Sequence, residues 1–191
     1  MSTWTNSAGS VILALLLSAT AAPAEVKVTP PPGYCVSPGG TEAGVVLMGS
    51  CAGMNGRPSG RRVPAAILTA TIGPEGSAVP VDGAALQAFF GSTAGRAALS
   101  RDGRAATVQV LETAVVADAG RGLAFILRVR DSAPFPGGRA TEEYWRALLP
   151  LGDRMVTLTV LGLAAQPMEP AAGLALLRDF IASMRRANRG S

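Results

Sequence analysis

The chain has 191 residues, of which 48% are hydrophobic and 16% charged, a composition typical of a folded protein. It contains no histidine, which excludes Ser-His-Asp and Cys-His nucleophile systems, a histidine general base and the usual zinc sites. The net charge is +4, carried almost entirely by arginine; this favours anionic partners or reflects genome composition. Chemistry is restricted to carboxylates, tyrosines, arginines and the single lysine, Lys27.

Residues 1–24 have the pattern of a secretory signal peptide. A short apolar run, 11–17, precedes small residues and an Ala-Pro-Ala sequence that ends at Ala24. The run is shorter than the roughly 20 apolar residues of a transmembrane helix. We expect cleavage after Ala24 and a periplasmic or secreted protein; because no Lys or Arg precedes the run, retention as an N-terminal anchor is the alternative. One domain, 25–191, would then remain, with an extended lead-in at 25–32.

Cys35 and Cys51 are the only cysteines, and an exported protein with an even count is expected to pair them. Residues 37–44 read as a turn-rich linker and 45–48 as a strand-like run, and a hairpin or strand pair around that linker would bring the two cysteines close together. A redox couple lacks the C-x-x-C spacing, and a metal site lacks histidine ligands. The sequence therefore predicts a structural disulfide.

The elements that follow suggest an α+β domain. Strands are expected at 45–50 and 65–72, with a Gly-, Pro- and Arg-rich loop between them. "AALQAFFGSTAGRAALS" predicts a helix with Asp82 as N-cap, bent or broken at Gly91 or Gly95. Two hairpins are predicted next, followed by a helix over 169–188. We expect an antiparallel sheet of about six strands with two main helices packed on it.

Several stretches carry a family resemblance: "ALQAFF…AGRAALS", "EEYWRALLPLGDRMVTLTVLGL" and "GLALLRDFIASMRRAN". Together they resemble uncharacterised exported proteins of alphaproteobacteria, and the element order is similar to the PsbP-like (DcrB-like) fold. The resemblance covers residues 32–188. It implies a non-enzymatic accessory or binding module, and it identifies no functional residues, because no family motif matches these positions.

One candidate site lies where two aromatic residues meet an arginine. Tyr144, Trp145 and Arg146 follow Glu142 and Glu143, and they predict a partner-binding patch with amphipathic anchors and an anion contact. In the alternative, one aromatic packs beneath the terminal helix and the charges are solvated.

A second candidate site consists of arginines. Arg128 and Arg130 are two apart on a strand, so their side chains project together. With Arg57, Arg61 and Arg62 of the long loop they predict a surface for phosphate or carboxylate groups. In the alternative, Glu112 or Asp131 pairs the strand arginines as an ordinary solvated face.

The sequence thus favours an exported, non-enzymatic binding protein that contacts an envelope protein or complex. A binder of a small anionic ligand is the alternative, and a carboxylate-based hydrolase comes third. No cofactor, metal ion or nucleic-acid partner is expected, since the motifs and the strongly basic, aromatic-rich surface that these require are missing.

Overall fold

The computed structural model describes residues 25–42, 44–55, 63–117 and 122–189. The expected signal peptide, 1–24, lies outside this part. The strands are β1 (Tyr34–Glu42), β2 (Val45–Ser50), β3 (Ala66–Ile72), β4 (Val108–Ala117), β5 (Leu123–Asp131), β6 (Ala140–Leu151) and β7 (Arg154–Leu163). The helices are α1 (Cys51–Asn55), α2 (Gly83–Gly91), α3 (Thr93–Leu99) and α4 (Pro170–Ala187), with single 3₁₀ turns at Ala105–Thr107 and Pro136–Gly138.

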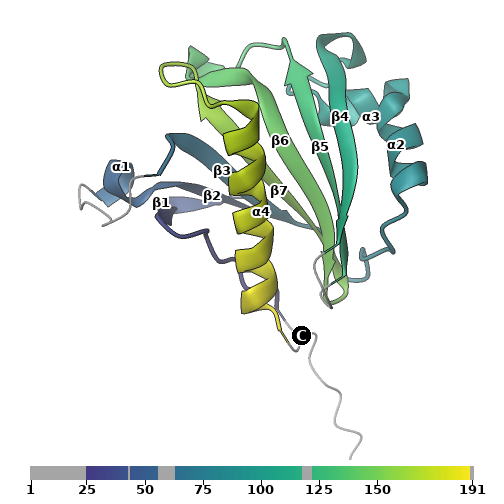
Figure 1. Cartoon of the computed structure of the whole chain (residues 1–191), viewed down its shortest axis with the longest axis horizontal. Helices are drawn as coiled ribbons and strands as arrows, with labels where there is room; N and C mark the ends of the chain where they lie inside the picture. The colour runs from purple at the N-terminus through teal and green to yellow at the C-terminus, as the bar shows by residue number, and fades with distance from the viewer. Residues whose placement is uncertain (1–24, 43, 56–62, 118–121, 190–191) are drawn as a thin grey trace, which may run out of the picture.

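The strands form one antiparallel sheet with the order β1-β2-β3-β7-β6-β5-β4 (Figure 1). This confirms the α+β class. The described residues contain seven strands and four α-helices, more than the six strands and two main helices expected.

The additional strand is β1, which includes most of the predicted linker. Its pairing with β2 shifts register between Val36 and Thr41, so that Pro38 and its neighbouring glycines are accommodated within an irregular edge strand. Proline is tolerated there because one side of an edge strand makes no ladder hydrogen bonds. The prediction of a linker is therefore wrong for residues 37–42, which belong to β1, whereas Gly44 is a turn residue and residue 43 lies outside the described part.

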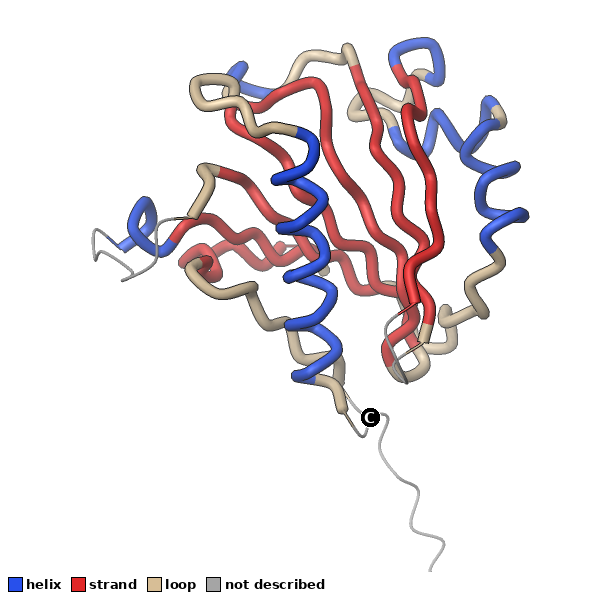
Figure 2. The backbone as a smooth tube through the Cα atoms, in the orientation of Figure 1, coloured by secondary structure: helices blue, strands red, loops and turns tan. Residues whose placement is uncertain are grey.

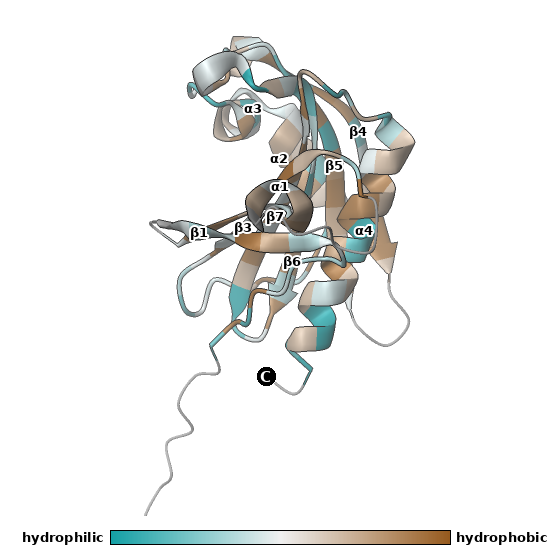
Figure 3. Cartoon of the chain, turned by 90° about the vertical axis from the view of Figure 1, so that its left-hand side faces the viewer, coloured by the Kyte–Doolittle hydropathy of each residue, from teal (hydrophilic) through white to brown (hydrophobic). Residues whose placement is uncertain are grey.

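One face of the sheet is covered by α4, which runs across the strands (Figure 2). Its buried side chains include Leu177, Phe180, Ile181 and Met184, packed on the inward-facing residues of the central strands. Figure 3 shows hydrophobic and hydrophilic residues along this helix, as its 3.6-residue pattern predicts.

The opposite face is covered by α2 and α3 only over the part nearest β4. Phe90 of α2 stacks on Phe125 of β5, with ring centroids 5.9 Å apart. The Asp82 carboxylate accepts hydrogen bonds from the backbone N–H groups of Ala84 and Ala85, which confirms the predicted N-cap. The two helices separate at Ser92, which ends α2 and caps α3.

Gly95 permits this tight turn between the helices. A Cβ atom at position 95 would lie 1.9 Å from the carbonyl oxygen of Phe89. The described residues contain no helix that is long and apolar enough to cross a membrane.

Candidate functional site

A groove of about 650 Å³ lies between the first turn of α4 and the sheet face formed by β5, β6 and β7. Its floor includes Trp145 and Val160, and Met168 forms part of the wall. The charged residues that line the groove are Arg128, Arg130, Glu142, Glu143 and Glu169. The structure therefore brings part of each predicted site into one groove.

The register of the strands determines how these charges pair. Arg130 lies directly opposite Glu143 on β6, and Arg128 lies opposite Glu112 on β4. Arg130 Nε donates to Glu143 Oε1 at 3.1 Å, and a terminal nitrogen of the same guanidinium also contacts that oxygen. Glu112 therefore lies beside Arg128, as in the alternative of a solvated face, whereas the partner of Arg130 is Glu143 and not Glu112 or Asp131.

Arg128 sits between two carboxylates. Its Nε lies 3.8 Å from Glu112 Oε2, and its Nη1 lies 3.8 Å from Glu143 Oε2. Both oxygens of Glu143 thus contact arginine side chains. Asp131 has a different role, because it is fully buried and accepts backbone hydrogen bonds.

Trp145 is fixed beneath α4. Its indole Nε1 donates to the carbonyl of Pro170 at 3.0 Å, and the guanidinium of Arg128 lies 5.9 Å from the ring centroid. The side chain is 5% exposed. This position agrees with the alternative in which one aromatic packs under the terminal helix, and it makes Trp145 part of the groove floor rather than a protruding anchor.

Tyr144 and Arg146 lie on the opposite face of the sheet from Trp145, because successive side chains of a strand alternate. The hydroxyl of Tyr144 donates to the carbonyl of Leu99 at 2.6 Å, and burial raises the pKa of this phenol. Arg146 lies over the Tyr144 ring, 5.1 Å from its centroid. The three residues predicted as one patch are therefore divided between two surfaces, and any role of each in partner binding stays a prediction.

Two further predictions concern the N-terminal half. Cys35 and Cys51 form the predicted disulfide, with their Cα atoms 4.9 Å apart at the open end of the β1–β2 hairpin. Arg57, Arg61 and Arg62 lie outside the described residues. Their predicted anion contacts stay a prediction.

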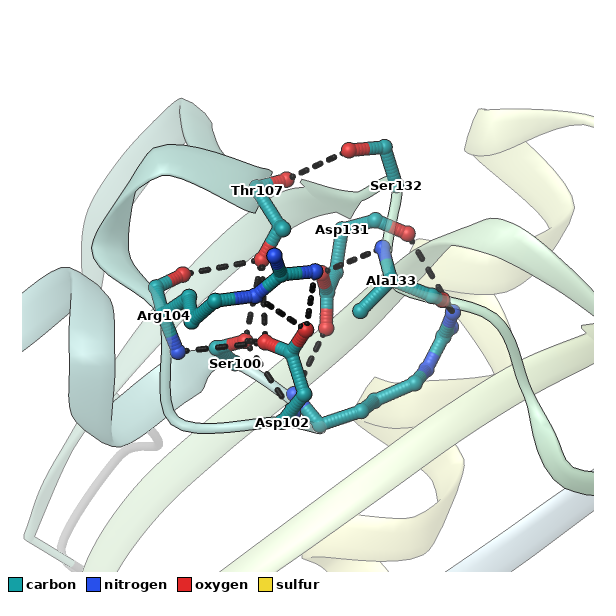
Figure 4. Close-up of polar contacts among 8 residues, drawn as sticks. Ser100, Asp102, Arg104, Thr107, Asp131, Ser132 and Ala133 are labelled. Carbon is teal, nitrogen blue, oxygen red and sulfur yellow. Dashed lines mark hydrogen bonds and ion pairs between the residues drawn. The ribbon is translucent and has the colours of Figure 1, made fainter.

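A polar cluster after α3 was not anticipated from the sequence (Figure 4). Ser100 donates to Asp102 at 2.7 Å, and Arg104 Nε donates to the same carboxylate at 2.7 Å. The neighbouring Asp131 accepts from the backbone N–H groups of Arg101 and Ala133. The short spacing of Ser100, Asp102 and Arg104 is a turn signal that could have indicated the first part of this cluster.

The carboxylates of the groove do not form an evident metal centre. Within 25–42, 44–55, 63–117 and 122–189, no group of three or more His, Cys, Asp or Glu residues is placed to hold a metal ion.

Comparison with protein-family models finds no match, and comparison with curated proteins finds no relative.

Proposed function

We propose that this chain is an exported, non-enzymatic binding protein of the bacterial periplasm, PsbP-like in character, which docks a segment of an envelope protein in the groove beside α4. The observation that carries the proposal is the combination of an apolar floor with charged lining residues in one groove of about 650 Å³. Sites of this size with a few placed polar groups are typical binding sites.

The charges of the groove favour a basic segment. Three glutamates and two arginines line it, and Glu112 adds a further carboxylate next to Arg128. Glu142 and Glu169 are exposed, and neither forms an ion pair with another described residue. A lysine or arginine of a partner would complement these two carboxylates, while its apolar neighbours contact Trp145 and Met168.

A small anion has weaker support at this surface. Arg128 and Arg130 already contact Glu143, so an anion would have to displace that carboxylate. A hydrolase would need two carboxylates free to reach a substrate. Glu143 is engaged by both arginines, so Glu142 and Glu169 would have to fill this role, and cleavage of a bound peptide would reveal it.

The groove can be tested with an extended peptide in which lysines alternate with valines, using the exported protein. Trp4 lies in the expected signal peptide, so Trp145 would be the only tryptophan of the mature chain and its fluorescence would report binding. We expect Glu142→Lys combined with Glu169→Lys to weaken binding about tenfold, from about 0.5–1 kcal/mol per charge contact. Asp179→Lys is the control, because Asp179 is an exposed acid of α4 outside the groove.

Equal binding of a glutamate-valine peptide would contradict the charge argument, and unchanged binding by the double variant would exclude the groove as the binding site.

Mass spectrometry of the recovered peptide checks the non-enzymatic part of the proposal, since a cleaved peptide would indicate a hydrolase. A photo-crosslinker placed at position 142 in cells, with position 179 as control, would then identify the natural partner.

A further inference from the structure

A second, smaller pocket of about 260 Å³ lies on the sheet face opposite α4. Its floor consists of two rows of side chains that cross the strands. One row contains Leu47, Thr69, Thr159 and Arg146, in which each residue is the cross-strand neighbour of the next. The adjacent row contains Ile67, Leu161 and Tyr144. The C-terminal end of α3 and Phe135 form the wall.

This pocket exists because α2 and α3 leave part of the sheet uncovered. Those helices pack mainly on β4, with further contacts to Phe125 of β5 and Tyr144 of β6, whereas the pocket extends beyond them over β2, β3 and β7. Leu47 is 40% exposed there, and Ile67 and Phe135 are partly buried. The pocket thus combines apolar side chains with a few polar groups, Thr69, Thr159 and Arg146, as small-molecule binding sites do.

The charge of the pocket is purely positive, which distinguishes it from the groove. Among the described residues that line it, the ionic side chains are Arg101 and Arg146, and none is a carboxylate. Arg101 is held in place by the backbone, because its guanidinium donates to the carbonyls of Asp131, Ala133 and Thr141. The buried carboxylate of Asp131 accepts its backbone N–H and helps to balance its charge.

Arg146 is the available cation. Its Nε donates weakly to Thr159 Oγ1 at 3.3 Å, and no described carboxylate lies within ion-pair distance of its guanidinium. Its two terminal nitrogens form no hydrogen bond with a described residue. Arg146 lines the pocket and is half-buried, and a guanidinium with unused terminal nitrogens is suited to a bidentate contact with one carboxylate.

We propose that this pocket binds a small amphipathic carboxylate, a single carboxylate group joined to a short apolar tail. The carboxylate contacts Arg146, with the hydroxyl of Thr159 beside it, and the tail lies over Ile67, Leu161 and Leu47. The volume corresponds to about nine liquid water molecules, taking about 30 Å³ each, so the tail holds fewer than about ten carbons. The site is on the other face of the sheet from the groove and does not depend on the function proposed there.

The pocket can be tested by calorimetry of the exported protein, with octanoate as the ligand. The neutral control of equal chain length is 1-octanol, and the affinities of both are measured. We expect octanoate to bind and octanol to bind about tenfold or more weakly, as the loss of a charge-assisted contact predicts. Arg146→Gln should weaken octanoate to the level of octanol. Arg178→Gln should leave it unchanged, because Arg178 is an exposed arginine of α4 that lines neither this pocket nor the groove.

A second measurement locates the ligand in the unchanged protein and so does not depend on how the variants fold. Nuclear Overhauser contacts are expected between octanoate methylene protons and the methyl groups of Leu47 and Ile67. Any of four results would overturn the proposal. Octanoate and octanol could bind with equal affinity, or octanoate could fail to bind at all. Octanoate could also keep its full affinity for Arg146→Gln, or its contacts could map to α4 instead.

Discussion

Gly173 of α4 lies directly against the indole ring of Trp145. A Cβ atom at position 173 would lie 2.7 Å from Cδ1 and 3.1 Å from Nε1 of the ring, closer than packed atoms approach. The absence of a side chain at this one position lets the first turns of the helix approach the sheet and form a wall of the groove.

Gly173→Ala should therefore destabilise the protein, although alanine is the better helix former by about 1 kcal/mol. Overpacking against the rigid indole costs about 1–3 kcal/mol, which leaves a net loss of about 1 kcal/mol in the free energy of unfolding. Urea denaturation measures this. The control is Gly173→Ala in a protein that also carries Trp145→Leu, where the glycine substitution should increase the free energy of unfolding. If Gly173→Ala alone stabilised the protein, the indole would have to move aside freely.

The disulfide should contribute about 3 kcal/mol to stability, as the chain-entropy relation predicts for a loop of about this length. Cys35→Ser combined with Cys51→Ser should lower the free energy of unfolding by that amount. Reductant should destabilise the natural protein equally and leave the double variant unchanged. A natural protein whose urea midpoint ignores reductant would argue against this contribution.

The sequence was informative where local pattern and tertiary structure agree. The strand at 154–163 and the helix at 169–188 were recognised from sequence pattern, and Asp82 was recognisable as a cap because capping is a local interaction. The cysteine pair was predictable from its count and the expected compartment. β1 was missed because Pro38, Gly39 and Gly40 are loop residues in most contexts, whereas here pairing with β2 overrides their preferences.

The candidate site was harder to predict, because it depends on register. Tyr144 and Trp145 are adjacent in sequence, yet strand alternation places them in separate hydrophobic cores. Glu143 becomes the partner of Arg130 only through the pairing of β5 with β6. Residue types alone could indicate that arginines and aromatic residues belong to a binding site. The pairing of neighbouring strands decides which of these arginines has a carboxylate partner.

Both tyrosines of the chain should resist ionisation in the folded protein. Burial raises the pKa of Tyr34 to about 12, and burial also raises the pKa of Tyr144. Both pKa values in the folded protein lie above the unfolded value of about 10. The contribution of the neutral phenols to the free energy of unfolding is therefore fully present below a pH of about 10, and it is lost as the pH rises toward 12. Tyrosinate absorbance should stay absent at pH of about 10.5 in native protein and appear in denaturant. A native titration with a midpoint near 10 would contradict the burial of these phenols.

Asp102 should titrate well below a usual aspartate. The hydrogen bond from Ser100 is the main cause, with Arg104 contributing, and the pKa of this carboxyl falls to about 2. Since the folded pKa is below the unfolded value of 3.8, the stabilising effect is present above that value and is lost as the pH falls toward 2. Carbon-13 titration of the carboxyl measures the pKa. Ser100→Ala should move it upward, whereas an unchanged midpoint would mean that Arg104 alone determines it.

Glu143→Gln should create an anion site in the groove, where Arg128 and Arg130 contact Glu143 in the natural protein. The substitution removes the ion-pair partner of Arg130 and one of the two partners of Arg128. Because these pairs are partly exposed, the free energy of unfolding should fall by only about 1 kcal/mol or less. At constant ionic strength, inorganic phosphate should then raise the melting temperature of the variant and have little effect on the natural protein. Glu142→Gln is the matched control, since Glu142 forms no ion pair with a described residue. If phosphate stabilised the natural protein as strongly as Glu143→Gln, the arginines would be accessible despite Glu143, and a small anion would become the better occupant of the groove than a basic segment.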